Sequence, residues 1–381
     1  MAQPGEFRPL ALGTLAVWPP VVLAPMAGVT NYAFRSLCRE FGAGLYVSEM
    51  ITARGLLEGN ARTRLLASSR PDESPRSVQL YGSDPLALGA AARALAAEGV
   101  QHIDLNFGCP VPKVTRHSGG SAIPVKPRLM ARLVRAAVRG AEPVPVTVKV
   151  RLGIDAALLT FQDAGRVAEE EGAAAIGLHA RTAAQLYAGE ADWAAIAELK
   201  AAVRIPVLGN GNLWECWDAL RMMRQTGCDG VIVGRGCLRR PWLFAELAAV
   251  FAGREPGPQP RLGDIVAIMR EHATRLIAFF GPAVGIWQMR KWCLWYTAGF
   301  RGAATLRQAL LQIHSLEEML AILGRLDPAE PFPLDALRRS RAKDGRRQEQ
   351  VRLPPGFLAR RDDDTPPCAD DAALERALDG G

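Results

Sequence analysis

Eight short apolar runs recur along the first two thirds of the chain, and most are followed by a stretch rich in alanine and leucine. Several runs are nearly all apolar, which is typical of strands covered on both faces. Strand and helix signals that alternate eight times predict a (β/α)8 TIM barrel, of the α/β class. An open doubly wound sheet fits less well, because no GxGxxG motif follows the first run. The predicted strands are Val21–Ala24, Leu45–Ser48, Ser77–Tyr81, His102–Asn106, Val146–Val150, Ala175–His179, Pro206–Gly209 and Gly230–Val233.

The pattern changes after the eighth run. Glycine and proline mark a linker, and the strand signals then stop. Helical spacing over Asp264–Phe280 and Ala283–Tyr296, and a capping box that begins at Ser315, predict a small helical domain. From Arg338 the chain is charged and poor in apolar residues, so we expect a disordered tail. The predicted segments are 1–251 as the catalytic barrel, 252–261 as the linker, 262–337 as the helical domain and 338–381 as the tail.

The composition is that of a globular protein, with 49% hydrophobic and 22% charged residues. The net charge of +7 permits a polyanionic partner without requiring one. The seven cysteines show neither a CxxC pair nor zinc spacing, which favours free thiols in a reducing cytosol and no metal. The apolar segment 10–23 has no basic region beyond Arg8 and contains Pro19-Pro20, so we expect a cytoplasmic protein without a membrane segment.

One cysteine lies in a tight turn directly after a predicted strand, in the sequence Asn106-Phe107-Gly108-Cys109-Pro110. The carboxyl ends of strands are where α/β folds gather catalytic groups. With an ordinary pKa of ~8.5 the Cys109 thiol is mostly protonated at neutral pH and can donate a proton. The alternative is a small buried hydrophobic residue, the usual fate of an isolated cysteine.

Polar side chains follow the other predicted strands in order, and a barrel would bring them to one site. Gln79 carries both a donor and an acceptor, which suits the edge of a heterocycle. Lys149 could stabilise electron density on a reduced cofactor ring, or form a Schiff base as in barrel aldolases. His179 could equally be a satisfied core histidine. The remaining strand-end candidates are Pro25, Met26, Ala27, Asn106, Arg151 and Arg181.

The last two predicted strands end in glycine-rich loops, Gly209-Asn210-Gly211-Asn212 and Gly234-Arg235-Gly236. Glycines expose backbone N–H groups and Arg235 adds a positive charge. Loops after the last two strands of a TIM barrel often bind phosphate. Such turns also occur in α/β proteins that bind no phosphate.

Taken together, these motifs resemble those of the tRNA-dihydrouridine synthases, and most closely the bacterial B-type branch. The resemblance covers about Val21 to Phe300 and leaves out the C-terminal tail. The matching strings are Leu23-Ala-Pro-Met-Ala-Gly-Val-Thr-Asn-Tyr-Ala-Phe-Arg35, Gln79-Leu-Tyr-Gly82, Asn106-Phe-Gly-Cys-Pro110, Gly120-Ser-Ala122, Lys149-Val-Arg-Leu-Gly153, His179-Ala-Arg-Thr182, Gly209-Asn-Gly211 and Gly234-Arg235.

The resemblance implies FMN in the barrel mouth, NADPH (or NADH) as reductant, and reduction of the C5–C6 double bond of a uridine in tRNA. Cys109 is then the proton donor, and Asn106, Arg151 and Arg181 are expected to contact the substrate. Asn212 departs from the aspartate often found there in the family. A monomer is favoured. The implied FMN-binding residues are Pro25, Met26, Ala27, Gln79, Lys149, His179, Asn210, Gly211, Asn212, Gly234 and Arg235.

Two other functions remain open at this point. An FMN-dependent dehydrogenase of a free pyrimidine, similar to dihydroorotate dehydrogenase, would use comparable chemistry, although it would not need a helical domain with basic residues. A catalytically idle barrel that only binds RNA would contain no flavin.

Overall fold

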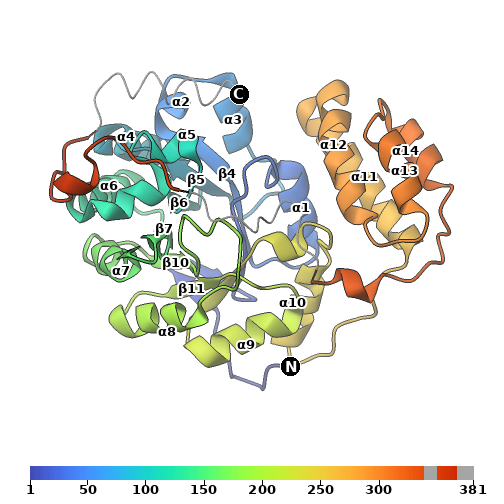
Figure 1. The fold of residues 1–381 in the computed structure, drawn as a ribbon, viewed down its shortest axis with the longest axis horizontal. Helices are drawn as coiled ribbons and strands as arrows, with labels where there is room; N and C mark the ends of the chain where they lie inside the picture. The colour runs from blue at the N-terminus through green and yellow to red at the C-terminus, as the bar shows by residue number, and fades with distance from the viewer. Residues whose placement is uncertain (339–349, 367–381) are drawn as a thin grey trace.

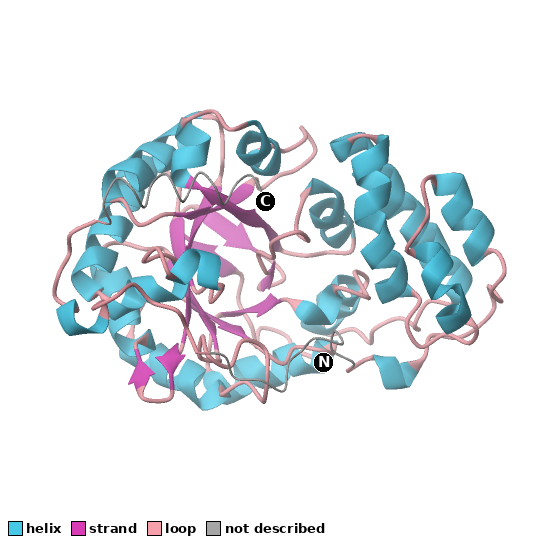
Figure 2. Cartoon of the chain, turned by 45° about the horizontal axis from the view of Figure 1, so that its top comes forward, coloured by secondary structure: helices cyan, strands magenta, loops and turns pink. Residues whose placement is uncertain are grey.

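The structure is a computed structural model that describes residues 1–338 and 350–366. Eight parallel strands close into a barrel, and helices surround it (Figures 1 and 2). The predicted (β/α)8 fold is therefore confirmed. The barrel strands are β3 (Val21–Leu23), β4 (Leu45–Thr52), β5 (Ser77–Tyr81), β6 (His102–Phe107), β7 (Val146–Arg151), β10 (Ala175–His179), β11 (Val207–Asn210) and β12 (Gly230–Val233).

The strands follow chain order around the ring, from β3 through to β12, which pairs back to β3. Every residue of β5 is buried, as expected for a strand with the barrel core on one face and helices on the other. The hairpin of β1 (Leu10–Leu12) and β2 (Leu15–Val17) packs its apolar side chains against the barrel core near Val22 and Leu45. The amino-terminal ends of the strands are thereby covered.

The outer layer consists of helices that follow the strands and bury their apolar sides on the barrel. The α4 and α6 helices approach closely at Gly89 and Gly140, because a Cβ on Gly140 would lie 2.2 Å from the Gly89 carbonyl oxygen. Only glycine fits at such a crossing. The helices are α1 (Tyr32–Glu40), α2 (Ala53–Leu57), α3 (Ala61–Ala67), α4 (Pro85–Ala97), α5 (Pro112–Thr115), α6 (Pro127–Ala141), α7 (Phe161–Glu170), α8 (Trp193–Ala202), α9 (Cys216–Thr226) and α10 (Leu243–Phe251).

Four further helices lie beside the barrel, at the right of Figure 1: α11 (Leu262–Phe280), α12 (Pro282–Tyr296), α13 (Ala303–Leu310) and α14 (Leu316–Leu323). The predicted cap at Ser315 is present, since its side chain accepts the Glu318 N–H at 3.1 Å. Helix α11 packs on α1, where the rings of His272, Phe34 and Trp292 contact one another. Among the described residues, no helix combines the length and apolar character that crossing a bilayer requires.

The tail prediction needs correction for residues 350–366, which lie on the barrel beside α6 (Figure 1). We call this segment the strap. Phe357 is 6% exposed and packs with Ala122, Val125 and Ile154. Thr115 donates to the Arg352 carbonyl oxygen at 2.7 Å, and Lys126 lies 3.3 Å from the Asp363 carboxylate. High charge and few apolar residues predicted disorder, but a few isolated apolar side chains suffice to anchor the strap. The basic cluster at 339–347 lies outside the described residues.

Phe357→Ala should release the strap. Burial of the phenyl ring stabilises docking by about 2 kcal/mol, so the undocked fraction should rise at least about tenfold. The initial rate of trypsin cleavage at Arg360 and Arg361, followed by mass spectrometry, measures this fraction. Leu358→Ala is the matched control, because Leu358 is half exposed. Equal cleavage rates for wild type and Phe357→Ala would mean that the strap does not depend on this contact.

His272 should make the protein sensitive to acid. Burial, followed by the charges of Lys291 and Arg275, lowers its pKa from 6.5 to about 3. The unfolded chain therefore binds a proton that the folded chain excludes, and stability is lost as the pH falls below 6.5, by about 2 kcal/mol at pH 5. Urea unfolding at pH 7 and pH 5 should show this loss, and His272→Phe should reduce it. An unchanged pH dependence in the variant would contradict the assignment.

Candidate functional site

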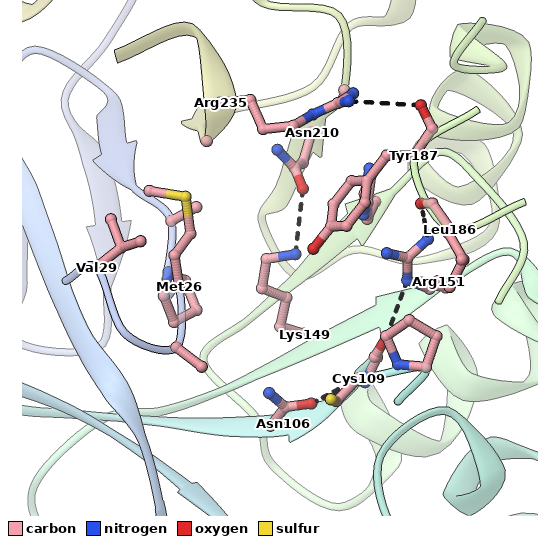
Figure 3. A pocket seen from close by; sticks show the side chains of 18 of the residues that line it. Met26, Val29, Asn106, Cys109, Lys149, Arg151, Leu186, Tyr187, Asn210 and Arg235 are labelled. Atoms are coloured by element: carbon pink, nitrogen blue, oxygen red, sulfur yellow. Dashed lines mark hydrogen bonds between the residues drawn. The ribbon is translucent and has the colours of Figure 1, made fainter. Parts of the chain in front are cut away.

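A cavity of about 560 Å³ opens at the carboxyl ends of the barrel strands (Figure 3). This volume is typical of a site for a small molecule or cofactor. Of the residues that the sequence singled out, Arg181 does not line the cavity. Those that do are Pro25, Met26, Ala27, Gln79, Asn106, Cys109, Lys149, Arg151, His179, Asn210, Gly211, Asn212, Gly234 and Arg235.

The Cys109 turn is held by a side chain from the preceding strand. Asn106 Oδ1 accepts the backbone N–H groups of Gly108 and Cys109 at 3.2 and 2.9 Å. The Cys109 carbonyl oxygen accepts the Ser121 N–H at 3.0 Å. Gly120, at φ +54°, is required here, because a Cβ would lie 2.4 Å from that carbonyl oxygen. Burial raises the pKa of the Cys109 thiol, which therefore stays protonated at neutral pH.

Arg151 braces the same turn from β7. Its guanidinium donates to the Gly108 carbonyl oxygen at 2.9 Å, and to those of Thr182 and Leu186 at 3.0 and 2.7 Å. These bonds connect the Cys109 turn to the loop after β10. The positive charge of Arg151 also lowers the pKa of Cys109 and so opposes the effect of burial. Arg151 is thus placed to stabilise a thiolate whenever Cys109 gives up its proton.

Gln79 and Asn106 form a ladder of amides on the cavity wall. Asn106 Nδ2 donates to Gln79 Oε1 at 2.9 Å, and Gln79 Nε2 donates to Asp104 Oδ2 at 2.7 Å. An amide group has two N–H bonds and two lone pairs, so each partner satisfies only part of it. Gln79 therefore retains one donor and one acceptor position.

Lys149 projects into the middle of the cavity, where Nζ donates to Asn210 Oδ1 at 3.1 Å (Figure 3). Asn210 is oriented by its own donation to the Ile232 carbonyl oxygen at 2.7 Å. Burial, followed by the charge of Arg151, lowers the pKa of Lys149 to about 8. Burial, with Arg151 and Lys149 next, holds the pKa of His179 well below its usual value, so the imidazole is neutral. The wall thus carries concentrated positive charge beside a neutral histidine.

The two glycine-rich loops lie together across the cavity from Cys109. The Arg235 guanidinium lies between the Tyr187 and Trp214 rings, 4.8 and 5.2 Å from their centroids. Such aromatic contacts favour a cation while leaving its charge in place. A cationic side chain is therefore fixed at the rim between the ends of β11 and β12.

The Arg181 side chain lies outside the cavity, behind this rim. Its guanidinium donates to the carbonyl oxygens of Ala188 and Gly189 and to Asn212 Oδ1, so it shapes the loop instead of facing the cavity. Asn212 also donates to the Glu190 carboxylate. An aspartate at this position would oppose Glu190, which gives the departure at Asn212 a physical reason.

Sequence reasoning missed several cavity residues. Leu186 and Tyr187 come from the loop after β10, far enough past the strand that the strand-end rule gave no signal. Met50 lies in the second half of β4, which continues beyond the predicted Leu45–Ser48. Asp104 does not line the cavity but holds Gln79, and it could have been found, because it alternates with Asn106 and so shares its face of the strand.

Lys149 should lower the stability of the flavin-free protein. Its pKa is lower in the folded chain than the ordinary 10.5, so stability rises with pH between about 8 and 10.5. Lys149→Met should raise Tm at pH 7 by about 2 to 5 °C, after allowance for the lost Asn210 bond. The gain should vanish near pH 10.5. Thermal unfolding of both proteins across this pH range tests the prediction. A variant Tm below that of the wild type at pH 7, or a Tm difference that does not change with pH, would contradict it.

A closed parallel barrel whose strand ends surround one polar cavity defines a TIM-barrel enzyme. The family model of Dihydrouridine synthase (Dus) matches residues 22–329. A probable tRNA-dihydrouridine synthase of Mycobacterium tuberculosis is 52% identical over 374 residues, 95% of this chain and 96% of that protein. The tRNA-dihydrouridine synthase B of Pseudomonas aeruginosa is 38% identical, over 79% of this chain and 90% of that protein.

The chain belongs to the dihydrouridine synthase family, and the resemblance seen in its motifs is confirmed. It is therefore an oxidoreductase. Among solved structures, a histamine dehydrogenase of Rhizobium sp. 4-9 is similar, with a TM-score of 0.50, 14% identity, and coverage of 70% of this chain and 50% of that one. At that identity the likeness supports the fold alone.

Proposed function

We propose that the protein is an FMN-dependent tRNA-dihydrouridine synthase that reduces the C5–C6 double bond of a uridine in tRNA, with NADPH as reductant. The observation that carries the proposal is that a protonated Cys109 and the cationic Lys149 share one cavity in a chain of this family.

The cavity residues fit a flavin. Gln79 offers one donor and one acceptor to a pyrimidine edge, and Lys149 provides a cation where a reduced ring gathers negative charge. Arg235 suits a phosphate at the opposite end of the cavity. Bound FMN would supply a hydride for C6 of the uracil. Pro25, Met26 and Ala27 would form the wall beside its ring, and His179, Asn210, Gly211, Asn212 and Gly234, which also line the cavity, would complete the site.

Cys109 supplies the proton. Its Sγ–H is transferred to C5 of the uracil, forming a C–H bond and leaving a thiolate beside Arg151. Water then reprotonates the sulfur. Because burial raises the pKa of Cys109, the thiol form persists through the neutral range. Asn106 and Arg151 hold the turn so that the sulfur faces the cavity.

A uridine can reach this cavity only if it leaves the base stack of the tRNA. The rim that would meet the nucleotide contains the exposed Val111 and Tyr187, and α5 adds the positive charge of Lys113. Helices α11–α14 would bind the tRNA body. There, Arg290 and Lys291 donate to backbone carbonyl oxygens, while Arg301 is exposed and better placed for phosphate contact.

The two rival functions make different demands on the molecule. A dehydrogenase of a free pyrimidine would need neither the helices beside the barrel nor the exposed basic residues. An idle RNA-binding barrel would not need a buried lysine at the centre of its cavity, which costs stability. The family match favours the tRNA enzyme over both.

Cys109→Ala should retain FMN and accept electrons from NADPH at the wild-type rate, yet form dihydrouridine about 10²- to 10⁴-fold more slowly, because it lacks the general acid. Single-turnover assays on unmodified tRNA transcripts, with flavin absorbance followed in parallel, separate the two half-reactions. Cys228→Ser is the matched control, since Cys228 is buried and donates to the Gly230 carbonyl oxygen, as serine can. Dihydrouridine formation within threefold of wild type would rule out the acid role.

A further inference from the structure

A chain of buried polar side chains runs through the barrel interior beneath the cavity. Ser77 Oγ lies 2.7 Å from His102 Nδ1, and His102 Nε2 lies 3.0 Å from Thr147 Oγ1. Thr147 donates to Asp104 Oδ1 at 2.6 Å. All four residues are at most 5% exposed. The proposed reaction uses none of them directly.

The same carboxylate continues toward the cavity. Asp104 Oδ2 accepts from Gln79 Nε2 at 2.7 Å, and Gln79 Oε1 accepts from Asn106 Nδ2 at 2.9 Å. Asn106 Oδ1 then accepts the backbone N–H groups of Gly108 and Cys109. An unbroken series of hydrogen bonds thus connects a buried carboxylate to the turn that carries the thiol.

Because the Asp104 carboxylate is ionised, it determines which group is the donor and which the acceptor in every hydrogen bond of this series. A carboxylate only accepts, so Thr147 must donate its hydroxyl hydrogen and in turn accept from His102 Nε2–H. His102 Nδ1 then accepts from Ser77. On the other side, Gln79 must present Nε2 to Asp104 and therefore Oε1 to Asn106. Asn106 must present Nδ2 to Gln79, which leaves Oδ1 to hold the turn.

We propose that Asp104 is a positioning residue, which fixes the direction of the Gln79 and Asn106 amides and thereby holds the Cys109 turn against the cavity. The carboxylate does not touch the cavity's contents itself. Its effect reaches the thiol through two amides, of which Asn106 is otherwise oriented by the turn and by a weaker contact of Nδ2 with the Met50 sulfur at 3.3 Å. The consequence for catalysis rests on the proposed function, whereas the structural effect does not.

Hydrogen exchange of the Gly108 and Cys109 amides tests the proposal in protein without tRNA or reductant. Asp104→Leu removes the acceptor while keeping the branching of the side chain, so exchange of both amides should become about tenfold faster, the equivalent of about one lost hydrogen bond. The Ser121 amide, whose acceptor is the Cys109 carbonyl, reports motion of the turn as a whole, and the Val148 amide reports global stability. Ser77→Ala should leave all four amides unchanged, because Asp104 keeps both of its donors.

Exchanging the carboxylate and the amide between positions 104 and 79 tests whether the direction of the hydrogen bonds matters, apart from the size or charge of the side chain at position 104. In the double variant Asp104→Asn with Gln79→Glu, the introduced amide can accept from Thr147 and donate to the introduced carboxylate, which can accept from Asn106. Asn106 then donates through Nδ2 to position 79, and its amide has the same orientation as in the wild type. Exchange of the Gly108 and Cys109 amides should return to within about threefold of wild type. Exchange as fast as in Asp104→Leu would overturn the proposal, and so would unchanged exchange in Asp104→Leu itself.

The two proposals fail in distinguishable ways. Asp104→Leu loaded with FMN should form dihydrouridine more slowly while NADPH still reduces its flavin, as for Cys109→Ala. If Cys109→Ala proved fully active, the proposed acid would be wrong, yet the exchange results would still decide the role of Asp104. If exchange were unaffected while Cys109→Ala was inactive, only the positioning role would be lost.

Discussion

Closure of the parallel sheet is the constraint on which the site depends. Because β12 pairs back to β3, the carboxyl ends of all eight strands meet around one cavity, and residues from Met26 to Arg235 become neighbours. The hairpin β1–β2 covers the opposite ends of the strands. The Cys109 turn is then held from two directions, by the Asn106 amide within β6 and by the Arg151 guanidinium from β7. Closure of the ring thus brings residues that are far apart in the sequence together in one cavity wall.

The charges in this wall are maintained against the preference of a buried environment for neutral groups. Lys149 and Arg151 both have lowered pKa values because of burial, and Asp104 has its pKa raised to about 6 by burial despite donors from Thr147 and Gln79. The positive charges of Lys149 and Arg151 at the cavity and the negative charge of Asp104 beneath it partly offset the cost of burying one another. A core selected only for stability would be apolar here, so the retained charges indicate a functional demand.

The sequence predicted the barrel well because strand-helix alternation is periodic and local, and it predicted most cavity residues because a closed ring turns strand ends into neighbours. It failed where position depends on side-chain contacts. Arg181 follows a strand like the others, yet its guanidinium turns to the loop carbonyls behind the rim. Tyr187 enters the cavity from a long loop, and Phe357 anchors a segment whose charge suggested disorder. These side-chain contacts arise only in the folded structure and cannot be inferred from the spacing of residues in the sequence.

The proposed reaction requires that Cys109 and the flavin act on one uridine that has left the base stack of the tRNA. A crystal structure of the FMN-loaded protein with a tRNA substrate tests it most directly. We predict a uracil ring in the cavity with Cys109 Sγ about 3 to 3.5 Å from C5, the separation expected of groups poised to react. A uracil whose C5 faces away from Cys109, or a tRNA bound with no base in the cavity, would contradict the account.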